Sequence, residues 1–248
     1  MHSRLPMIFI LLTVMIDSMG IGLIMPVMPD LIQELDAGDL GQAAVWGGIL
    51  ASIFAVMQFL FGPFIGGLSD RFGRRPVLLI ALVVMAFDYV LMAVAGTIWL
   101  LVIGRIIGGI TAATQSTAAA SMADISKPED KSANFGLIGA AFGVGFVLGP
   151  LMGGLLAEYG TRAPFWAAAV LAAANAVFGY FALPETVTDK IRRPFSFARA
   201  NPLGAFRQIG KLPGLGRMLG MTFIYGIGFF VYPSVWAYFG KLRFGWGP

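Results

Sequence analysis

Seven segments of this sequence are apolar over the length of a membrane helix, and no other feature constrains the fold as strongly. A helix needs about 20 mostly apolar residues to cross roughly 30 Å of hydrocarbon. Hydrophobic residues make up 58% of the 248 residues, charged residues only 12%, and the mean hydropathy is +0.81, which lies outside the usual composition of soluble domains. We therefore expect an all-α integral membrane protein. The predicted spans are 7–28, 44–66, 77–95, 98–123, 133–157, 164–183 and 217–239.

The N-terminal apolar run has to be distinguished from a signal peptide, which has a shorter apolar core followed by a small-residue cleavage site. Here the run continues through Pro26, and no such cleavage pattern follows it. We therefore interpret it as a retained first span.

The basic residues lie on alternate predicted loops. The loop 29–42, PDLIQELDAGDLGQ, has four acidic residues and no Lys or Arg, whereas the loop 66–76 and the segment 184–216 are rich in Arg. Because cytoplasmic loops of membrane proteins carry the excess of Lys and Arg, we expect a multi-pass protein of the inner (plasma) membrane with a cytoplasmic N-terminus. The net charge of +4 then reflects topology, and we expect the lipid bilayer and no nucleic acid as a partner.

Side chains suited to covalent or metal chemistry are scarce. The sequence has no cysteine, and its one histidine is His2, which leaves neither a thiol nucleophile nor a Cys/His metal site. It also lacks a Gly-rich loop ending in Lys-Ser/Thr, the signature of nucleotide binding. We expect no enzyme activity, no metal site and no cofactor.

A polar segment with several basic residues and prolines divides the chain. Residues 1–183 form a predicted bundle of six spans, residues 184–216 a cytoplasmic linker, and residues 217–248 the seventh span with the start of a second half. Carriers built from two related six-span halves have this organisation. We expect that the 248 residues do not transport alone and that a missing C-terminal half is their partner. The alternative is a natural half-carrier that pairs with itself or with a separate second half.

The most specific motif is the loop 66–76, GGLSDRFGRRP, which we call the signature loop. It joins two predicted helices by a very short turn, where Gly73 can adopt the positive φ that a tight reversal needs. Its acid, Asp70, can meet a helix N-terminus or a neighbouring arginine. Topology alone would explain the arginines but not the ordered pattern of Gly, Asp and Arg. The residues of this pattern are Gly66, Asp70, Arg71, Gly73, Arg74 and Arg75.

A second motif, GLIGAAFGVGFVLGPLMGG, occupies residues 136–154 in the fifth predicted span. Glycines four residues apart make a groove into which another helix backbone can press, and a proline bends the helix. The alternative is a lipid-facing helix of small residues. The motif is defined by Gly136, Gly145, Gly149, Pro150, Gly153 and Gly154.

Both motifs resemble those of the major facilitator superfamily, in which the second is the antiporter motif. More narrowly, the stretches DSMGIGLIMPVMP, SDRFGRRPVLL, GRIIGGITAAT and VWAYFGKLRFGW resemble tetracycline-resistance efflux proteins. The chain departs from that group at Gln115, where a small residue is usual, and in the linker. The resemblance implies the N-terminal half of the superfamily fold, proton-coupled efflux of a small molecule, and a signature loop that helps to hold a cytoplasmic gate between the halves.

Two charged residues lie at similar predicted depth in neighbouring spans. Asp88 lies eight residues before the turn at residues 96 and 97, and Arg105 eight residues after it. At about 1.5 Å per residue, both lie roughly 12 Å below the outer membrane boundary. Pairing is the usual way in which such groups are tolerated in the membrane, so the sequence predicts an ion pair. The pair can form a charged cavity wall, or it can be purely structural.

Asp17 has no basic residue in its own span and lies near mid-membrane, where an ionised acid costs roughly 2.5–3.5 kcal/mol. An acid that lacks a counter-charge and faces a wet cavity can take up and release a proton, so we assign proton coupling to Asp17. The alternative is that Asp17 only bonds neighbouring helices, although Ser, Thr and Asn serve that purpose more often.

Gln58 lies near the middle of the second predicted span and, by the resemblance, matches a position that faces a drug cavity. With Asp88, Arg105 and Gln115 it completes the predicted substrate-binding set, although a lone membrane Gln can also serve helix association only. The resemblance favours tetracycline as the small-molecule substrate, carried as a chelate of a divalent metal such as Mg2+ and exported at the expense of the proton gradient. Two alternatives stay open: a multidrug or other carrier of the same superfamily, and a non-transporting membrane protein that kept the fold.

Overall fold

The computed structural model describes residues 5–36, 38–112, 114–189, 192, 194–197, 200–202 and 214–246. Every regular element in these ranges is a helix. The helices are α1 (Leu5–Ile24), α2 (Met28–Asp36), α3 (Leu40–Phe72), α4 (Arg74–Ala93), α5 (Ile98–Thr111), α6 (Thr114–Ile125), α7 (Lys131–Ala157), α8 (Ala163–Ala182) and α10 (Leu215–Phe244).

Within the described residues, seven helical segments are long and apolar enough to cross a membrane, when α5 and α6 are counted together. They correspond to the seven predicted spans. Because lipid offers no hydrogen-bond partner, an apolar segment in the membrane has to satisfy its own backbone groups, and a helix does so. The all-α membrane fold expected from the sequence is confirmed.

The first helix is shorter than predicted. α1 ends at Ile24, residues 25–27 form a turn, and α2 begins at Met28 where the sequence analysis predicts a loop. Pro26 accounts for this break, because proline lacks the N–H that would continue the helix and disfavours the helical conformation of the residue before it. The predicted end of the span 7–28 is therefore wrong, and much of the loop 29–42 is helical.

The fourth predicted span, 98–123, is not one continuous helix. α5 ends at Thr111 and α6 begins at Thr114. Beside this interruption, the side chain of Gln58 on α3 donates a hydrogen bond from Nε2 to the carbonyl oxygen of Ala112, 3.2 Å away. Because the end of a helix leaves carbonyl groups without intrahelical partners, this contact satisfies a group that the interruption frees.

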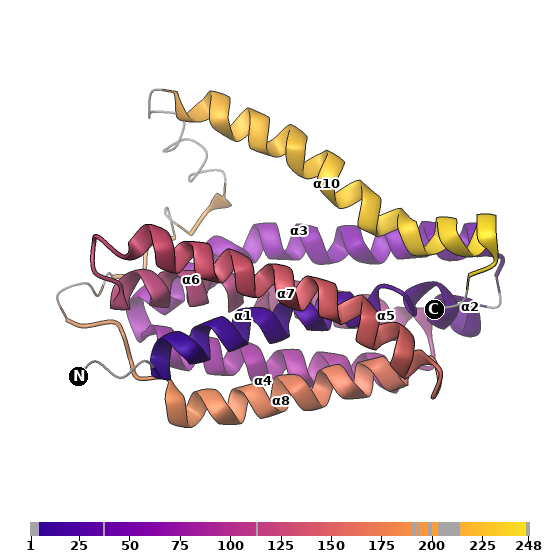
Figure 1. Cartoon of the computed structure of the whole chain (residues 1–248), viewed down its shortest axis with the longest axis horizontal. Helices are drawn as coiled ribbons and strands as arrows, with labels where there is room; N and C mark the ends of the chain where they lie inside the picture. The colour runs from indigo at the N-terminus through magenta and orange to yellow at the C-terminus, as the bar shows by residue number, and fades with distance from the viewer. Residues whose placement is uncertain are drawn as a thin grey trace.

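The central helix α1 packs directly against α7 (Figure 1). Glycines of the second motif face α1: a Cβ on Gly149 would lie 2.7 Å from both Gly22 Cα and Met19 O, and a Cβ on Gly145 or Gly153 would also collide with the α1 backbone. The two backbones approach so closely because these positions carry no side chain. The predicted helix groove is confirmed at these three glycines.

The rest of the motif differs in its surroundings. Among the described residues, no atom lies within 4 Å of a Cβ on Gly136, so the predicted close packing is not seen at this position within the described part of the chain. Gly154 is half-buried. α7 continues through Pro150, whose Cδ would lie 2.7 Å from a Cβ on Gly22. The close contact therefore belongs to the second half of α7.

We expect Gly149→Ala to destabilise the bundle by about 1–3 kcal/mol, the usual cost of forcing extra volume into a packed interior. The added Cβ would meet backbone atoms of α1, which no side-chain rotation can move aside. Thermal unfolding of the detergent-solubilised chain measures the loss. Gly143→Ala is the matched control, because Gly143 lies in the same helix and no atom of the described residues lies within 4 Å of its Cβ position. An equal loss for both variants would contradict the packing argument.

The helices run between two ends of the bundle (Figure 1). The turn between α3 and α4 lies at one end, which we call the signature end, and α2 lies at the opposite end. α10 approaches α3 near the opposite end and diverges from the bundle toward the signature end (Figure 1). None of the residues in the membrane-spanning window of α10 is buried. The first helix of the predicted second half is thus attached to the six-span bundle mainly at the opposite end.

Candidate functional site

The signature loop forms a turn of one residue between two long helices. α3 ends at Phe72, α4 begins at Arg74, and Gly73 between them has a φ of 112°. Residues with a side chain rarely adopt this backbone conformation. The positive φ predicted for Gly73 is confirmed, and the turn places the acid at the end of α3 beside the arginines at the start of α4.

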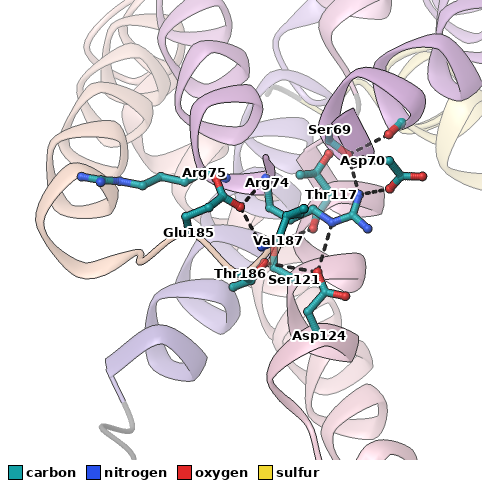
Figure 2. Close-up of polar contacts among 11 residues, drawn as sticks. Ser69, Asp70, Arg74, Arg75, Thr117, Ser121, Asp124, Glu185, Thr186 and Val187 are labelled. Atoms are coloured by element: carbon teal, nitrogen blue, oxygen red, sulfur yellow. Dashed lines mark hydrogen bonds and ion pairs between the residues drawn. The ribbon is translucent and has the colours of Figure 1, made fainter. Parts of the chain in front are cut away.

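Arg74 connects α3 and α6 at the signature end (Figure 2). Its Nη1 donates to Asp70 and, over 2.7 Å, to Ser69 Oγ in the last turn of α3. Ser69 Oγ in turn donates to the carbonyl oxygen of Gly66, 2.8 Å away. The Arg74 Nε donates to Asp124 Oδ2 over 3.2 Å, in the last turn of α6. The predicted contact of Asp70 with a neighbouring arginine is confirmed, and Arg74 provides it.

The other two arginines of the predicted cluster lie apart from these acids. Arg75 Nη2 donates to the carbonyl oxygen of Tyr180 on α8 over 2.7 Å, and its guanidinium lies 5.4 Å from the centroid of the Tyr180 ring. Arg71 is exposed, with its guanidinium 5.1 Å from the centroid of the Phe72 ring. Within the described ranges, Arg74 is therefore the one arginine of the loop that forms ion pairs.

Sequence reasoning missed Asp124 and Ser69. Asp124 is 16% exposed and lies at the end of α6, which places an acid at the same end of the bundle as the basic loop. That placement was the available signal. Ser69 is fully buried and belongs to the signature loop itself, but its small polar side chain gave no signal that it would bind Arg74.

The predicted ion pair inside the bundle is present. Arg105 Nη2 on α5 lies 3.4 Å from Asp88 Oδ2 on α4, and the two side chains are 15% and 3% exposed. The same Nη2 lies 2.6 Å from Met92 Sδ, and the guanidinium lies 5.3 Å from the centroid of the Phe54 ring. Asp88 Oδ1 and Arg105 Nε are buried with no hydrogen-bond partner in the described part of the chain. The pair thus leaves one acceptor and one donor unused.

Two glycines of α5 make room for the carboxylate of Asp88. A Cβ on Gly104 would lie 2.7 Å from Asp88 Oδ1, and a Cβ on Gly108 would lie 2.7 Å from Asp88 Oδ2. Residues four apart lie on the same face of a helix, so the carboxylate rests against a bare strip of α5 backbone. Sequence reasoning missed these glycines, although their spacing on the helix that carries Arg105 was a signal for close packing.

Asp17 lies in the middle of α1 and is 8% exposed. None of the ion pairs between described residues involves Asp17. Nearly one turn further along α1, the hydroxyl group of Tyr89 packs against Gly20. The lack of a basic partner predicted for Asp17 holds for the described residues, which leaves this acid buried without a counter-charge.

The two predicted glutamines both lie near the interruption between α5 and α6. Gln58 on α3 is exposed and bonds Ala112 within the interruption. Gln115 is half-buried in the first turn of α6. The fold therefore brings Gln58 of α3 to the end of α5, close to the helix that carries Gln115.

A contact that no sequence motif indicated lies at the opposite end. Lys241 on α10 forms an ion pair with Asp30 and donates to Gln33 Oε1 over 2.9 Å, both on α2. A cavity of about 590 Å3 lies between α10, α7 and the turn after α1. Its wall is mainly apolar and aromatic, and the aromatic residues are Phe146, Phe229, Tyr232, Trp236 and Trp246.

The sequence profile of the Major Facilitator Superfamily matches residues 10–248. The chain belongs to this superfamily. The signature loop and the glycine motif of α7 had indicated this family. In the fold of this superfamily, the six-span bundle corresponds to the first half, and the seventh helix to the beginning of the second half.

Among relatives, the chain is 43% identical over 246 residues to "Tetracycline resistance protein, class C" of Escherichia coli, which covers 99% of the chain and 61% of that relative. It is 39% identical over 241 residues to the class G protein of Vibrio anguillarum, covering 96% of the chain and 60% of that relative. The chain thus spans about three fifths of the length of these curated relatives.

Among solved structures, the human organic anion transporter MFSD10 superimposes with a TM-score of 0.77 at 24% sequence identity. The match covers 100% of this chain and 67% of the human protein. At this level of identity the likeness shows the shared fold, and it supports the assignment of the seven spans to the superfamily architecture.

Proposed function

We propose that this chain, together with a second half, forms a proton-coupled exporter of small molecules, with tetracycline as the leading substrate. The observation that carries the proposal is the identity of 43% over 246 residues to a tetracycline resistance protein. We propose a transporter and not an enzyme, working by alternating access, in which one half rocks against the other around a central site.

The polar groups inside the bundle support a role in transport. Asp88 Oδ1 and Arg105 Nε have no partner among the described residues, and buried polar groups without partners are costly unless another molecule or water binds them. Gln58 and Gln115 add neutral hydrogen-bonding groups beside the interruption after α5. In the proposal these four side chains bind the substrate, and the carboxyl group of Asp17 takes up the proton that drives export.

In this proposal the metal ion is part of the transported substrate and not a cofactor of the protein. Tetracycline would be carried as a chelate of a divalent cation such as Mg2+, and the carboxylate of Asp88 is an oxygen ligand of the kind that such a cation prefers. No resident cofactor is proposed, because the proton gradient supplies the free energy.

We propose that the chain lies in the inner membrane and that its signature end faces the cytoplasm. The arginines of the signature loop gather at this end, whereas α2 at the opposite end carries Asp30, Glu34 and Asp36, and cytoplasmic ends carry the excess of basic residues. The contacts of Arg74 with Asp70 and Asp124 would then form the first half's share of a cytoplasmic gate.

A chimera tests the proposal. The chain is joined to the portion of the class C relative that it does not match, and the product is expressed in drug-sensitive bacteria with the class C protein as positive control. We expect growth in tetracycline comparable to the positive control and no protection against unrelated cationic drugs. Equal protection against several cationic drugs would replace tetracycline with a multidrug assignment. A membrane-inserted chimera that protects against none of them would contradict the proposed export function.

A further inference from the structure

Glu185 lies just after α8, and its carboxylate binds the start of α4 (Figure 2). Glu185 Oε1 accepts a hydrogen bond from the backbone N–H of Arg74 over 2.9 Å, and Oε2 accepts one from the N–H of Arg75 over 3.3 Å. Glu185 Oε1 also accepts the N–H of Val187, 2.9 Å away. The carboxylate therefore closes its own turn and caps a helix that lies more than 100 residues away in sequence.

α4 needs this carboxylate because it has no cap of its own. Its N-cap residue is Gly73, which makes no side-chain hydrogen bond to the helix, and the first N–H groups of a helix have no intrahelical partner. A negative charge at this end also interacts favourably with the helix dipole. Gly73 allows the approach, since a Cβ at this position would collide with the carboxylate of Glu185.

The residue after Glu185 contacts the second acid of the network around Arg74. Thr186 Oγ1 donates to Asp124 Oδ2 over 3.2 Å. This carboxylate oxygen of Asp124 also accepts a hydrogen bond from Arg74 Nε over 3.2 Å. The segment that follows α8 thus binds the backbone of Arg74 on one side and the partner of its side chain on the other (Figure 2).

The linker also reaches the α3 side of the signature loop. Arg192 Nη1 donates to the carbonyl oxygen of Arg71 over 3.4 Å. The Phe195 ring lies 5.3 Å from the Phe64 ring between centroids, and its Cε2 would lie 3.2 Å from a Cβ on Gly67. The described linker residues therefore contact both helices of the signature loop, although the sequence predicts them as a connection between the halves.

We propose that Glu185 is a positioning residue of the gate: by capping α4 it fixes the backbone from which Arg74 reaches Asp70 and Asp124. This inference rests on the proposed gating role of the signature end. In this arrangement, the linker between the halves acts directly on the gate, because a displacement of Glu185 and Thr186 is transmitted to the first turn of α4 and to the end of α6.

The experiment uses the 248-residue chain in membranes and a single reporter cysteine, Ser121→Cys, which has no background because the sequence contains no cysteine. Ser121 is fully buried on α6, one turn before Asp124. Its labelling rate by a water-soluble maleimide therefore measures how often the contacts of α6 with α3 and α4 around Arg74 open. We expect Glu185→Ala to raise this rate at least about fivefold, the effect of losing a helix cap. The control variant Glu129→Ala removes an exposed acid in the loop before α7 and should leave the rate unchanged.

Glu185→Gln separates capping from packing. Glutamine has the same shape and fills the same space beside Gly73, but it presents one acceptor oxygen in place of two and carries no charge. A positioning role through the two N–H groups predicts a rate between those of the parent and Glu185→Ala. A rate equal to that of the parent would show that Glu185 only fills space, and would overturn the inference.

Arg74→Gln with the same reporter separates this inference from the proposed gate. We expect Arg74→Gln to raise the labelling rate as well, because it removes both ion pairs. If Arg74→Gln raises the rate and Glu185→Ala does not, the inference on Glu185 is wrong and the gate proposal stands. If neither variant raises the rate in correctly folded protein, the contacts of Arg74 do not hold α6 against α3 and α4, and the gate proposal fails with the inference.

Discussion

Removing the charge of Arg105 should cost the bundle about 3–5 kcal/mol of unfolding free energy, and removing Asp88 as well should restore part of this loss. The two side chains are 15% and 3% exposed, so a single replacement strands the remaining charge in a medium of low dielectric constant. In denaturant unfolding of the detergent-solubilised chain, Arg105→Gln and Asp88→Asn should therefore each have a lower free energy of unfolding than the double variant. Losses that simply add would contradict the contact.

The exposed pair Asp189 and Arg192 provides the matched control for this cycle. Their charged groups are 3.8 Å apart, and the side chains are 101% and 46% exposed, so water screens their attraction. The same cycle with Asp189→Asn and Arg192→Gln should show no measurable coupling. A coupling as large as that of the membrane pair would mean that the assay reports charge number and not burial.

The result bears on function as well as on stability. A pair that existed only for structure should be fully satisfied, yet Asp88 Oδ1 and Arg105 Nε have no partner in the described ranges. An apolar pair of similar volume is often as stable as a buried ion pair. A double variant that folds well but no longer exports in the chimera would therefore assign the charges to the substrate and not to the bundle.

The features that sequence reasoning predicted correctly depend on local or nearly local rules. The spans follow from the length of apolar runs, and the turn at Gly73 follows from the residue types around it. The contact of Asp88 with Arg105 follows from equal depth on two helices joined by a short turn. In each case the chain itself fixes the distance between the partners, so no knowledge of the tertiary fold is needed.

The features that were missed depend on helices that meet only in the folded bundle. Glu185 caps a helix that is more than 100 residues away in sequence, and no pattern near either residue indicates the partner. The division of the arginines is similar, because the direction of Arg75 toward Tyr180 is set by the packing of α4 on α8. The early end of α1 is different: Pro26 was a local signal, and the length of the apolar run outweighed it in the prediction.

Asp17→Asn should abolish proton coupling while the bundle stays as stable as before. Asp17 is 8% exposed and takes part in none of the ion pairs between described residues. Asparagine has nearly the same shape, and it removes the cost of about 2.5–3.5 kcal/mol that an ionised acid carries in mid-membrane. Thermal unfolding of the 248-residue chain should therefore show no loss of stability, which separates this variant from one that misfolds.

The coupling itself is measured in everted vesicles that contain the chimera with the class C second half. Adding the drug to vesicles with an established proton gradient should release protons through the parent chimera, and in Asp17→Asn the release should fall to that of vesicles without transporter, because an amide cannot take up and release a proton in this range of pH. Asp130→Asn is the control, since this exposed acid at the start of α7 makes no cap hydrogen bond through its side chain. Undiminished proton release by Asp17→Asn would remove Asp17 from the mechanism. The proton would then have to be carried by another acidic residue, of this half or of the second.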